Sequence, residues 1–220
     1  MTDAAVEKVK KLDTSTVSDA MDRLGIAGQC LGIKPLVHSF RLCGRAFTMR
    51  CVPVEVVAGS VGDYIDDVPT GEIVVIDNGG RQDKTIWGDI LTQVAHNRGV
   101  GGTVIDGNCR DVQKSLELNY PIYSRGWSMR TGKDRIQLDQ MHVPVSIGDA
   151  RVEPGDMLLG DADGVICIPK AKEEEIIALS LEIDAAEAEI LAAVNSGMRL
   201  DEAREQFRYH TLQRREGSKK

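Results

Sequence analysis

The stretch Glu72–Asp111, EIVVIDNGGRQDKTIWGDILTQVAHNRGVGGTVIDGNCRD, combines two apolar runs with a helical pattern between them. The runs at 72–77 and 103–106 are rich in β-branched residues, which is typical of buried strands in a parallel sheet. Between them, a turn is predicted at 78–80 and a helix at 89–98, with a glycine just past its end. This order of strand, helix and strand predicts a parallel crossover unit and therefore an α/β fold.

Further elements are predicted on both sides of this unit. A helix is expected over 14–24, with Thr14 or Ser15 as its cap and Gly25 at its end. A strand is expected at 44–57, where β-branched residues alternate with others. The later elements are a helix at 111–118, mixed or antiparallel strands at 143–147, 150–152, 157–159 and 165–168, helices at 170–194 and 200–213, and a polar tail at 214–220.

The composition favours one folded domain with a helical appendage. The chain has 220 residues, 42% of them hydrophobic, and a formal net charge of -7; a chain of this length buries roughly 70% of its unfolded surface. Its acidic balance makes nucleic acid an unexpected partner. No stretch approaches the ~18 apolar residues of a membrane span, and the charged start does not resemble a signal peptide, so no membrane partner is expected.

The cysteines indicate the compartment in which the protein works. They are odd in number, widely separated and never arranged as C-x-x-C, so neither a disulfide framework nor a structural zinc site is indicated. This usage favours a reducing environment, and we expect a cytoplasmic protein. The five cysteines are Cys30, Cys43, Cys51, Cys109 and Cys167.

Polar side chains converge at one edge of the predicted sheet. The helix that begins at Asp89 has its N-terminus at the edge where both parallel strands end. Arg110 and Asp111 follow the second strand after a short turn, 107–109, and so reach the same edge. This edge is the usual binding crevice of open α/β sheets. Two carboxylates and one guanidinium are therefore expected to meet there.

These groups suit a 2-oxo acid and a divalent cation. The N–H groups of Ile90 and Leu91, at the positive end of the helix dipole, can hold an anionic oxygen. Arg110 can bind a carboxylate through two hydrogen bonds. Asp111 can bind a hard cation, Mg²⁺ or Mn²⁺ rather than zinc. The alternative is a structural role, because an Asp at a helix start is often only a cap and an Arg-Asp pair is often only an ion pair.

The segments around these residues resemble a known family. WGDILT at 87–92 and RGVGGTVIDGNCRD at 98–111 are similar to the family that contains the regulator of ribonuclease activity A (RraA) and the 4-hydroxy-4-methyl-2-oxoglutarate aldolases. The family hallmark is an Asp, twenty intervening residues and then Arg-Asp, which Asp89, Arg110 and Asp111 match. Further matches, which extend the resemblance from about Thr14 to Pro169, lie at 17–20, 124–126, 154–156 and 160–165.

The resemblance implies an architecture and a reaction. It implies a layered α/β/β sandwich core with a metal and pyruvate site over residues 1–170. A C-terminal helical extension over 171–220 would pack on the body or on a neighbouring subunit of a homo-oligomer, a trimer or a hexamer. It also implies a lyase, a class II type pyruvate aldolase that uses a divalent metal, cleaves 4-hydroxy-2-oxo acids such as 4-hydroxy-4-methyl-2-oxoglutarate and decarboxylates oxaloacetate.

The resemblance also implies a role for each site residue. Asp111 is implied as a direct metal ligand, and Arg110 as the group that binds the pyruvyl carboxylate and stabilises the enolate. Asp89 is implied to position a water on the cation and to help deliver a proton to the pyruvate methyl group. The substrate-binding residues are implied to be Arg110, Gly88, Ile90 and Leu91.

A glutamate from a neighbouring subunit's C-terminal region completes the metal site in the aldolases of this family. Glu187 is the candidate in this chain, and Glu189 is the second choice. Members that act only as ribonuclease regulators tend to be shorter and to lack the acidic residue at Asp89, so this chain resembles the enzymes more. Some members have an acidic residue where this chain has Lys114, a departure that bears on substrate identity.

Other features leave two alternatives open. Gly126–Lys133 has five residues between its glycines where a phosphate-binding loop needs four, so nucleotide binding is not expected. The glycines of 78–80 are expected to face the crevice and let substrate approach. Cys109 is expected to pack in its turn rather than to act as a reactive thiol. The alternatives to an enzyme are a protein-binding inhibitor of a ribonuclease and a small-molecule-binding protein with an inactive site.

Overall fold

A large mixed sheet forms the centre of the molecule. The computed structural model describes residues 3–55, 59, 62–207 and 209. Its strands are β1 (Lys34–Pro35), β2 (Leu42–Pro53), β3 (Ile73–Thr85), β4 (Gly102–Cys109), β5 (Ile122–Trp127), β6 (Ile136–Met141), β7 (Val145–Ile147), β8 (Ala150–Val152), β9 (Met157–Asp161) and β10 (Gly164–Ile168). Its helices are α1 (Ala4–Val9), α2 (Thr14–Leu24), α3 (Asp89–Asn97), α4 (Val112–Glu117), α5 (Glu173–Asn195) and α6 (Leu200–Gln206), with 3₁₀ turns η1 (Asp63–Asp67) and η2 (Lys170–Lys172).

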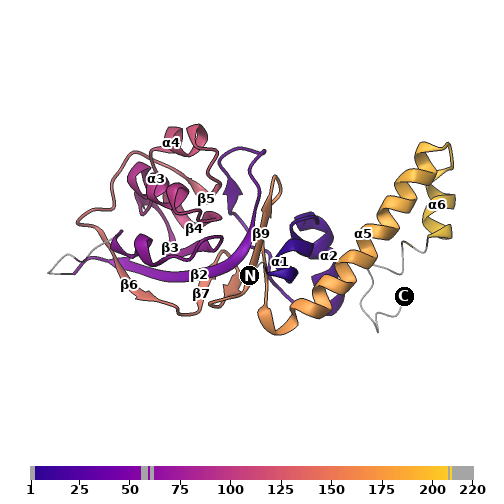
Figure 1. The fold of residues 1–220 in the computed structure, drawn as a ribbon, viewed down its shortest axis with the longest axis horizontal. Coiled ribbons are helices and arrows are strands. Elements are labelled where there is room, and N and C mark those ends of the chain that lie inside the picture. Colours follow the sequence, from indigo (N-terminus) through magenta and orange to yellow (C-terminus); the bar gives the residue numbers. More distant parts are fainter. Residues whose placement is uncertain (1–2, 56–58, 60–61, 208, 210–220) are drawn as a thin grey trace.

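The sheet is sandwiched between helices and a small hairpin (Figure 1). Its strand order is β1-β5-β4-β3-β2-β9-β10, with β6 paired to β2. Strands β2, β3, β4 and β5 run parallel to one another, whereas β9 and β6 run antiparallel to β2, and β1 runs antiparallel to β5. Helices α3 and α4 cover one face, and the β7–β8 hairpin covers the other. The predicted α/β fold with α/β/β layering is confirmed.

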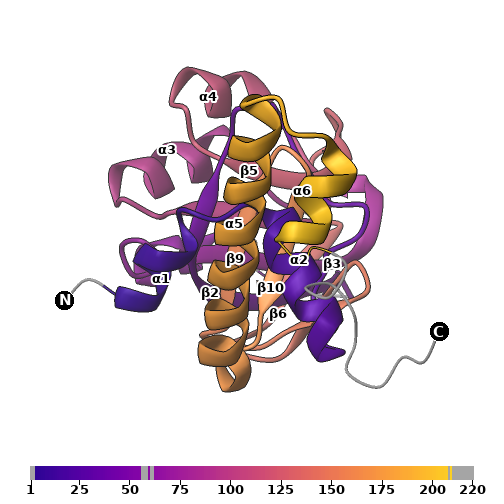
Figure 2. The same cartoon turned by 90° about the vertical axis from the view of Figure 1, so that its right-hand side faces the viewer.

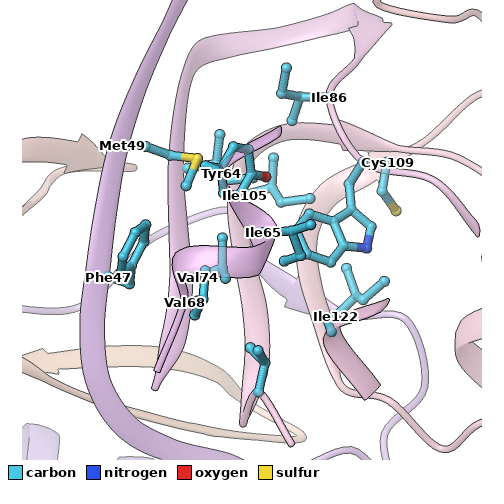
Figure 3. Close-up of a cluster of buried hydrophobic side chains, with 14 of the residues drawn as sticks. Phe47, Met49, Tyr64, Ile65, Val68, Val74, Ile86, Ile105, Cys109 and Ile122 are labelled. Atoms are coloured by element: carbon cyan, nitrogen blue, oxygen red, sulfur yellow. The ribbon is translucent and has the colours of Figure 1, made fainter. Parts of the chain in front are cut away.

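Strand β3 supplies side chains to the cores on both faces. Val74 and Ile76 belong to the cluster beneath α3, together with Phe47 and Ile105 (Figure 3). The intervening side chains, Ile73 and Val75, belong to the cluster beneath the β7–β8 hairpin. The four side chains of β3 are fully buried. A strand covered on both faces is apolar throughout, which is why this run was recognisable in the sequence.

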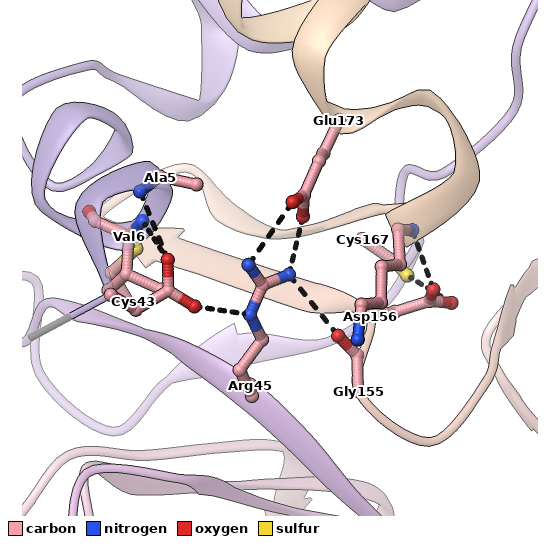
Figure 4. A network of polar contacts seen from close by, with 10 residues as sticks. Ala5, Val6, Cys43, Arg45, Gly155, Asp156, Cys167 and Glu173 are labelled. Carbon is pink, nitrogen blue, oxygen red and sulfur yellow. Dashed lines mark hydrogen bonds and ion pairs between the residues drawn. The ribbon is translucent and has the colours of Figure 1, made fainter. Parts of the chain in front are cut away.

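A second group of helices packs beside the layered body. Helices α1, α2 and α5 bury apolar side chains against β9 and β10, and Figure 2 shows α5 lying across this end with α1 and α2 on either side. Arg45 of β2 connects the starts of α1 and α5 to the sheet. Its guanidinium donates to Asp3, just before α1, at 2.8 Å and to Glu173, the first residue of α5 (Figure 4). The hydrogen bond from Arg45 lowers the pKa of Asp3.

Two segments predicted as turns lie inside strands. Residues 78–80 belong to β3, where Gly79 and Gly80 have φ angles of 61° and 69°. The pairing of β3 with β4 shifts register after Asp77 and then resumes. Residues 107–109 likewise belong to β4. Glycines in these segments allow each strand to bulge without ending. The predicted turns at 78–80 and 107–109 are therefore wrong.

Helix α2 begins and ends where predicted, but its capping differs. Thr14 and Ser15 are not caps, because the helix already includes them and its N-cap is Asp13, which makes no side-chain cap hydrogen bond. The N–H and hydroxyl of Thr14 instead donate to the Asp161 carboxylate at 2.8 and 2.7 Å. A partner distant in sequence could not be read from a local capping pattern. Gly25 ends the helix with a φ of 70°, as predicted.

The other boundaries differ by a few residues. The strand predicted at 44–57 begins earlier and ends at Pro53, and residues 56–57 lie outside the described part of the chain. The helix predicted from 170 begins at Glu173. Residues 210–220, with the predicted polar tail, also lie outside the described part. In the part that the structure does describe, no helix combines the length and the apolar character needed to cross a membrane.

Candidate active site

Helix α3 presents its N-terminus at the end of β3. Gly88 is its N-cap and Asp89 its first residue. The N–H and hydroxyl of Thr92 both donate to the Gly88 carbonyl, at 3.0 and 2.9 Å, and the indole N–H of Trp87 donates to the Thr92 hydroxyl at 2.9 Å. The buried Trp87 ring stacks on Tyr120 with 6.2 Å between centroids. The first turn of α3 is therefore fixed to the core.

Strand β4 brings Arg110 and Asp111 to the same edge of the sheet. The Arg110 N–H donates to the Trp87 carbonyl at 2.9 Å, so the end of β4 is hydrogen-bonded to the segment that precedes α3. Asp111 has a left-handed backbone, with φ 55° and ψ 40°. It is the N-cap of α4 but makes no side-chain cap hydrogen bond. Its carboxylate is thus not used to hold the helix that it precedes.

The structure brings the three hallmark residues together. Arg110 Nε lies 3.2 Å from Asp111 Oδ2, and the Asp89 N–H donates to the same oxygen at 3.4 Å. A Cβ atom at Gly88 would lie only 2.8 Å from that oxygen, so a glycine leaves the room that the carboxylate occupies. The Arg110 and Asp111 side chains are each 38% exposed. Solvent and ligands can therefore reach this ion pair.

These residues lie at a cleft of about 520 Å³. Asp111 contacts two of the lining residues but does not line the cleft itself. The lining includes the predicted site residues Gly88, Asp89, Ile90, Leu91 and Arg110. It also includes Gly62, Asp63, Ile65 and Asp66 from η1 and the residues just before it, Val94 of α3, and the segments 85–87 and 131–133.

The backbone N–H groups of α3 are partly engaged. The Ile90 N–H, predicted to hold a substrate carboxylate, donates to Asp89 Oδ1 at 2.8 Å. A substrate can use this N–H only after the Asp89 carboxylate turns away. The Leu91 N–H belongs to the same first turn, in which helices leave N–H groups without intrahelical acceptors. The positive end of the helix dipole favours an anion at this position.

The oxygen donors fit a hard divalent cation. Asp111 offers an accessible carboxylate, and both of its contacts engage Oδ2. Mg²⁺ commonly binds through one or two carboxylates and takes its other ligands from water and substrate. Within the described residues, no group of three or more His, Cys, Asp and Glu side chains is placed to hold a metal ion. Among the described residues, a cation at Asp111 would therefore find fewer than three such side chains, and water and substrate would have to supply other ligands.

Glu187 and Glu189 do not join this site within one chain. They lie on α5, at the opposite end of the molecule from α3 and α4 (Figure 1). Burial raises the pKa of Glu187, and the nearby carboxylates of Asp19 and Asp184 raise it further. A role for Glu187 as a metal ligand of a neighbouring subunit stays a prediction.

Two walls of the cleft were not predicted from the sequence. Asp63 and Asp66 lie on η1, and Lys133 lies in a turn just before β6, an element that was not predicted. The only sequence feature near Lys133 was the glycine spacing of 126–133, which was set aside as an imperfect phosphate loop. The turn with Lys133 reaches the site through the antiparallel pairing of β6 with β2, and η1 reaches it by packing against α3. Neither tertiary contact is encoded by a local pattern.

Three other expectations have clear outcomes. Gly79 and Gly80 are not among the described residues that line the cleft, and a Cβ on Gly80 would face Arg125 instead. Cys109 is fully buried in β4, and burial raises its pKa to about 11, so its thiol is not activated. Lys114 forms an ion pair with Glu117 on α4, with 3.3 Å between the charged atoms.

The chain is similar to curated proteins over most of its length. The family model described as RraA-like, Aldolase/RraA, matches residues 14–167. DlpA of Legionella pneumophila is 35% identical over 207 residues, which cover 93% of this chain but only 34% of DlpA. A protein of Halalkalibacterium halodurans, provisionally named a 4-hydroxy-4-methyl-2-oxoglutarate aldolase, is 33% identical over 172 residues, or 78% of this chain and 80% of that protein.

Solved structures share the fold. An uncharacterized protein from Pseudomonas syringae pv. tomato superimposes with a TM-score of 0.86 at 38% identity, covering 93% of this chain and 98% of that one. RraAS2 of Streptomyces coelicolor, described as an unusual member of the RNase ES inhibitor RraA protein family, has a TM-score of 0.77 at 25% identity and covers 90% of this chain and 98% of its own.

Proposed function

The chain belongs to the RraA-like, Aldolase/RraA family, and from this premise we propose that it is a divalent-metal-dependent pyruvate aldolase. It would cleave 4-hydroxy-2-oxo acids such as 4-hydroxy-4-methyl-2-oxoglutarate and would also decarboxylate oxaloacetate. The observation that carries the proposal is the meeting of Arg110, Asp111 and the N-terminus of α3 at one cleft. The provisional aldolase name of the Halalkalibacterium halodurans relative supports the same reaction class.

Arg110 would bind the pyruvyl half of the substrate. Cleavage of the carbon–carbon bond next to a ketone leaves negative charge on the keto oxygen, and donors fixed in advance stabilise that charge. The Arg110 guanidinium is fixed in this way, because its Nε lies 3.2 Å from Asp111 Oδ2 and its backbone is bonded to Trp87. Loss of one such donor raises a barrier by roughly 3 kcal/mol.

Asp89 would move the proton at the pyruvate methyl carbon. In the structure its carboxylate accepts the Ile90 N–H at 2.8 Å. When the substrate carboxylate takes this N–H, the carboxylate of Asp89 is released into the cleft that it lines. Substrate binding and the freeing of the proton-transfer group would therefore be one event. The Leu91 N–H and the space beside Gly88 would complete the carboxylate site.

Asp111 would hold the cation, for which Mg²⁺ and Mn²⁺ are the candidates. Bound there, the cation would supply positive charge close to the keto oxygen. Glu187 of a neighbouring subunit would complete its ligands, with Glu189 as the second choice. This arrangement would require a homo-oligomer, a trimer or a hexamer, because Glu187 belongs to α5, which lies away from α3 and α4 in one chain (Figure 1).

Release of pyruvate tests this proposal. Oxaloacetate and a panel of 4-hydroxy-2-oxo acids are supplied with Mg²⁺, with Mn²⁺ or with a chelator, and pyruvate is followed by a coupled assay. The proposal predicts release that requires the metal and that falls by about 100-fold or more in Arg110→Ala and Asp111→Ala. Absence of activity with every divalent ion, or activity that survives both substitutions, would contradict it.

The second candidate function is inhibition of a ribonuclease by direct binding. The likeness to RraAS2, at a TM-score of 0.77, favours it. Addition of the protein to a ribonuclease E-type enzyme, with cleavage of a labelled RNA as the readout, distinguishes the two candidates. The regulator hypothesis predicts inhibition that does not change in Asp111→Ala. The enzyme hypothesis predicts no inhibition and a loss of pyruvate release in the same variant.

A further inference from the structure

The hydroxyl of Thr92 connects the core of the protein to the first peptide of α3. It donates to the Gly88 carbonyl at 2.9 Å and accepts the indole N–H of Trp87 at 2.9 Å. An indole N–H can only donate, so the hydroxyl must accept there, and its own proton is left for the Gly88 carbonyl. Thr92 and Trp87 are both buried. The hydroxyl is therefore held in a single orientation.

Trp87, which orients this hydroxyl, also contacts the other half of the site. Its carbonyl accepts the Arg110 N–H at 2.9 Å. Its ring is parallel to that of Tyr120, with an angle of 1° between the two planes, and the Tyr120 hydroxyl lies 2.8 Å from the Thr103 hydroxyl of β4. Trp87 thus joins the end of β4 through its backbone to the first turn of α3 through its side chain.

The peptide between Gly88 and Asp89 transmits this constraint to Asp111. Its carbonyl accepts both the hydroxyl and the N–H of Thr92, the latter at 3.0 Å. The peptide is trans and planar, so its C=O and N–H point in opposite directions, and a fixed carbonyl fixes the direction of the Asp89 N–H. That N–H donates to Asp111 Oδ2 at 3.4 Å, beyond the usual range for such bonds, so a small rotation of the peptide would break it.

This N–H is one of two donors that orient the Asp111 carboxylate. The other is Arg110 Nε, 3.2 Å from the same oxygen. Oδ1 has no partner among the residues that the structure describes, so the two donors on Oδ2 leave Oδ1 for a ligand. Groups that hydrogen-bond a metal ligand fix its orientation, and their loss commonly weakens metal binding or activity by roughly 10- to 100-fold.

Building on the proposed function, in which Asp111 holds the cation, we propose that Thr92, oriented by Trp87, is a positioning residue for the Asp111 carboxylate. Thr92 acts through the peptide between Gly88 and Asp89. Donors on the carbonyl of a peptide also polarise it and strengthen its N–H as a donor. Without the hydroxyl, the peptide would be less constrained and Asp111 would lose one of its two orienting donors. The cation affinity would therefore depend on a buried hydroxyl that is not among the described residues lining the cleft.

Binding of Mn²⁺ in the absence of substrate tests this inference independently of catalysis. Dissociation constants are measured by titration calorimetry on the full chain after chelator treatment, and pyruvate release from oxaloacetate is followed in parallel. Thr92→Val keeps the shape of the side chain but lacks the hydroxyl, and it should weaken Mn²⁺ binding by about tenfold or more. Thr92→Ser keeps the hydroxyl and should stay within a few-fold of the parent. Trp87→Phe leaves the hydroxyl free to rotate and should weaken binding, but by less than Thr92→Val.

Thr48→Val is the matched control for the loss of a buried hydroxyl. Thr48 is fully buried, donates its hydroxyl to the Val143 carbonyl at 2.7 Å and is not among the described residues that line the cleft. Its substitution should lower the midpoint of urea unfolding, as Thr92→Val should, but leave the Mn²⁺ dissociation constant unchanged. This comparison separates a general loss of stability from a loss of orientation at Asp111.

Mn²⁺ affinity that is unchanged in Thr92→Val, that falls equally in Thr48→Val or Thr92→Ser, or that is undetectable in the parent protein would overturn the inference. If Thr92→Val does not fold, an unchanged affinity in Trp87→Phe would overturn it. Absence of pyruvate release from a parent protein whose Mn²⁺ affinity does depend on Thr92 would overturn the proposed function and leave the positioning role standing.

Discussion

Asp111 combines a left-handed backbone, φ 55°, with a carboxylate that caps nothing. Asp and Asn adopt this conformation more readily than most residues, but it still carries a cost when no local hydrogen bond offsets it. The carboxylate instead faces Arg110 Nε and the Asp89 N–H. Asp111 is therefore held where the end of β4 meets the start of α3, in a position from which its carboxylate can bind a ligand. Because Gly88 has no side chain, this carboxylate has room beside α3.

Gly88→Ala tests how closely the site is packed. The added Cβ would lie 2.8 Å from Asp111 Oδ2 and 3.3 Å from Arg110 Nε, so both side chains must shift. The backbone of Gly88 is extended, with φ -148°, and an alanine adopts it without strain. We expect kcat/KM for pyruvate release to fall by about tenfold or more, equivalent to ~1.4 kcal/mol. The midpoint of urea unfolding should stay close to that of the parent; unchanged activity would show that the contact is irrelevant.

Asp89→Asn separates proton transfer from metal binding. The amide keeps the size of the side chain but cannot take up or release a proton at the substrate. Affinity for Mn²⁺, measured by isothermal titration, should therefore stay within a few-fold of the parent value, while turnover is lost. If Mn²⁺ binding disappears together with activity, Asp89 is itself a ligand and its assigned role is wrong.

At the scale of elements, the sequence predicted those parts whose pattern is local. The apolar run in β3 and the stop at Gly25 were recognisable because burial on both faces and a left-handed φ each select particular residues. The continuation of β3 through 78–80 was missed because a bulge and a turn use the same glycines. The partner of Thr14 was missed because Asp161 lies on β9, far along the chain.

The candidate site was likewise predictable only where its residues belong to one local pattern. Asp89, Arg110 and Asp111 follow directly from one crossover unit and one family hallmark, so their meeting could be expected. The walls at Asp63 and Lys133 depend on how η1 and the turn before β6 fold onto that unit. Such contacts arise from tertiary packing, which leaves no periodic trace in the sequence.

Thr14→Val tests the anchor between α2 and β9. Burial opposes ionisation of Asp161, but hydrogen bonds from the Thr14 N–H and hydroxyl and from the Asp163 N–H outweigh it and lower the pKa of this carboxyl. A lowered pKa in the folded state adds stability above the ordinary value, about 3.9, and that stability is lost as the pH falls through the lowered pKa. Loss of the hydroxyl should reduce the free energy of unfolding by about 2 kcal/mol at pH 7.

The way in which this loss of unfolding free energy varies with pH tests the contact between Thr14 and Asp161 more specifically than its size at pH 7. The difference between parent and Thr14→Val should be full at pH 7 and should shrink below about pH 4, as Asp161 becomes protonated. Urea unfolding at several pH values measures it. Ser15→Ala, an exposed change on the same helix, should cost less than about 0.5 kcal/mol at any pH. A loss in Thr14→Val that does not vary with pH would show that the ionised carboxylate is not the partner.

At the scale of the whole molecule, α5 extends beyond the layered body (Figure 1). Its start is connected to the sheet through Glu173 and Arg45, and its first turns pack on α1, α2 and β10. Leu191 near its far end is 63% exposed. Under the proposed function, this arm would reach a neighbouring subunit, where Glu187 would act.

Mixing of two inactive variants tests whether the site is shared between subunits. Asp111→Ala and Glu187→Ala should each abolish metal-dependent pyruvate release. When the two are refolded together in equal amounts, roughly a quarter of the sites in a ring should combine an intact Asp111 with an intact neighbouring Glu187. Activity should recover accordingly, as measured by the same coupled assay. No recovery, or full activity of Glu187→Ala alone, would place the remaining metal ligands elsewhere; Glu189→Ala is the next variant to examine.

The central claim is that Arg110 and Asp111 stabilise a negatively charged pyruvyl oxygen with the help of a divalent cation. Exchange of the pyruvate methyl protons in D₂O, followed by proton NMR, tests it most directly because no aldol partner is needed. We predict exchange that requires Mg²⁺ or Mn²⁺, stops with a chelator and falls to the buffer rate in Arg110→Ala and Asp111→Ala. Exchange at the buffer rate in the parent protein with either metal, or exchange that persists in both variants, would contradict the account.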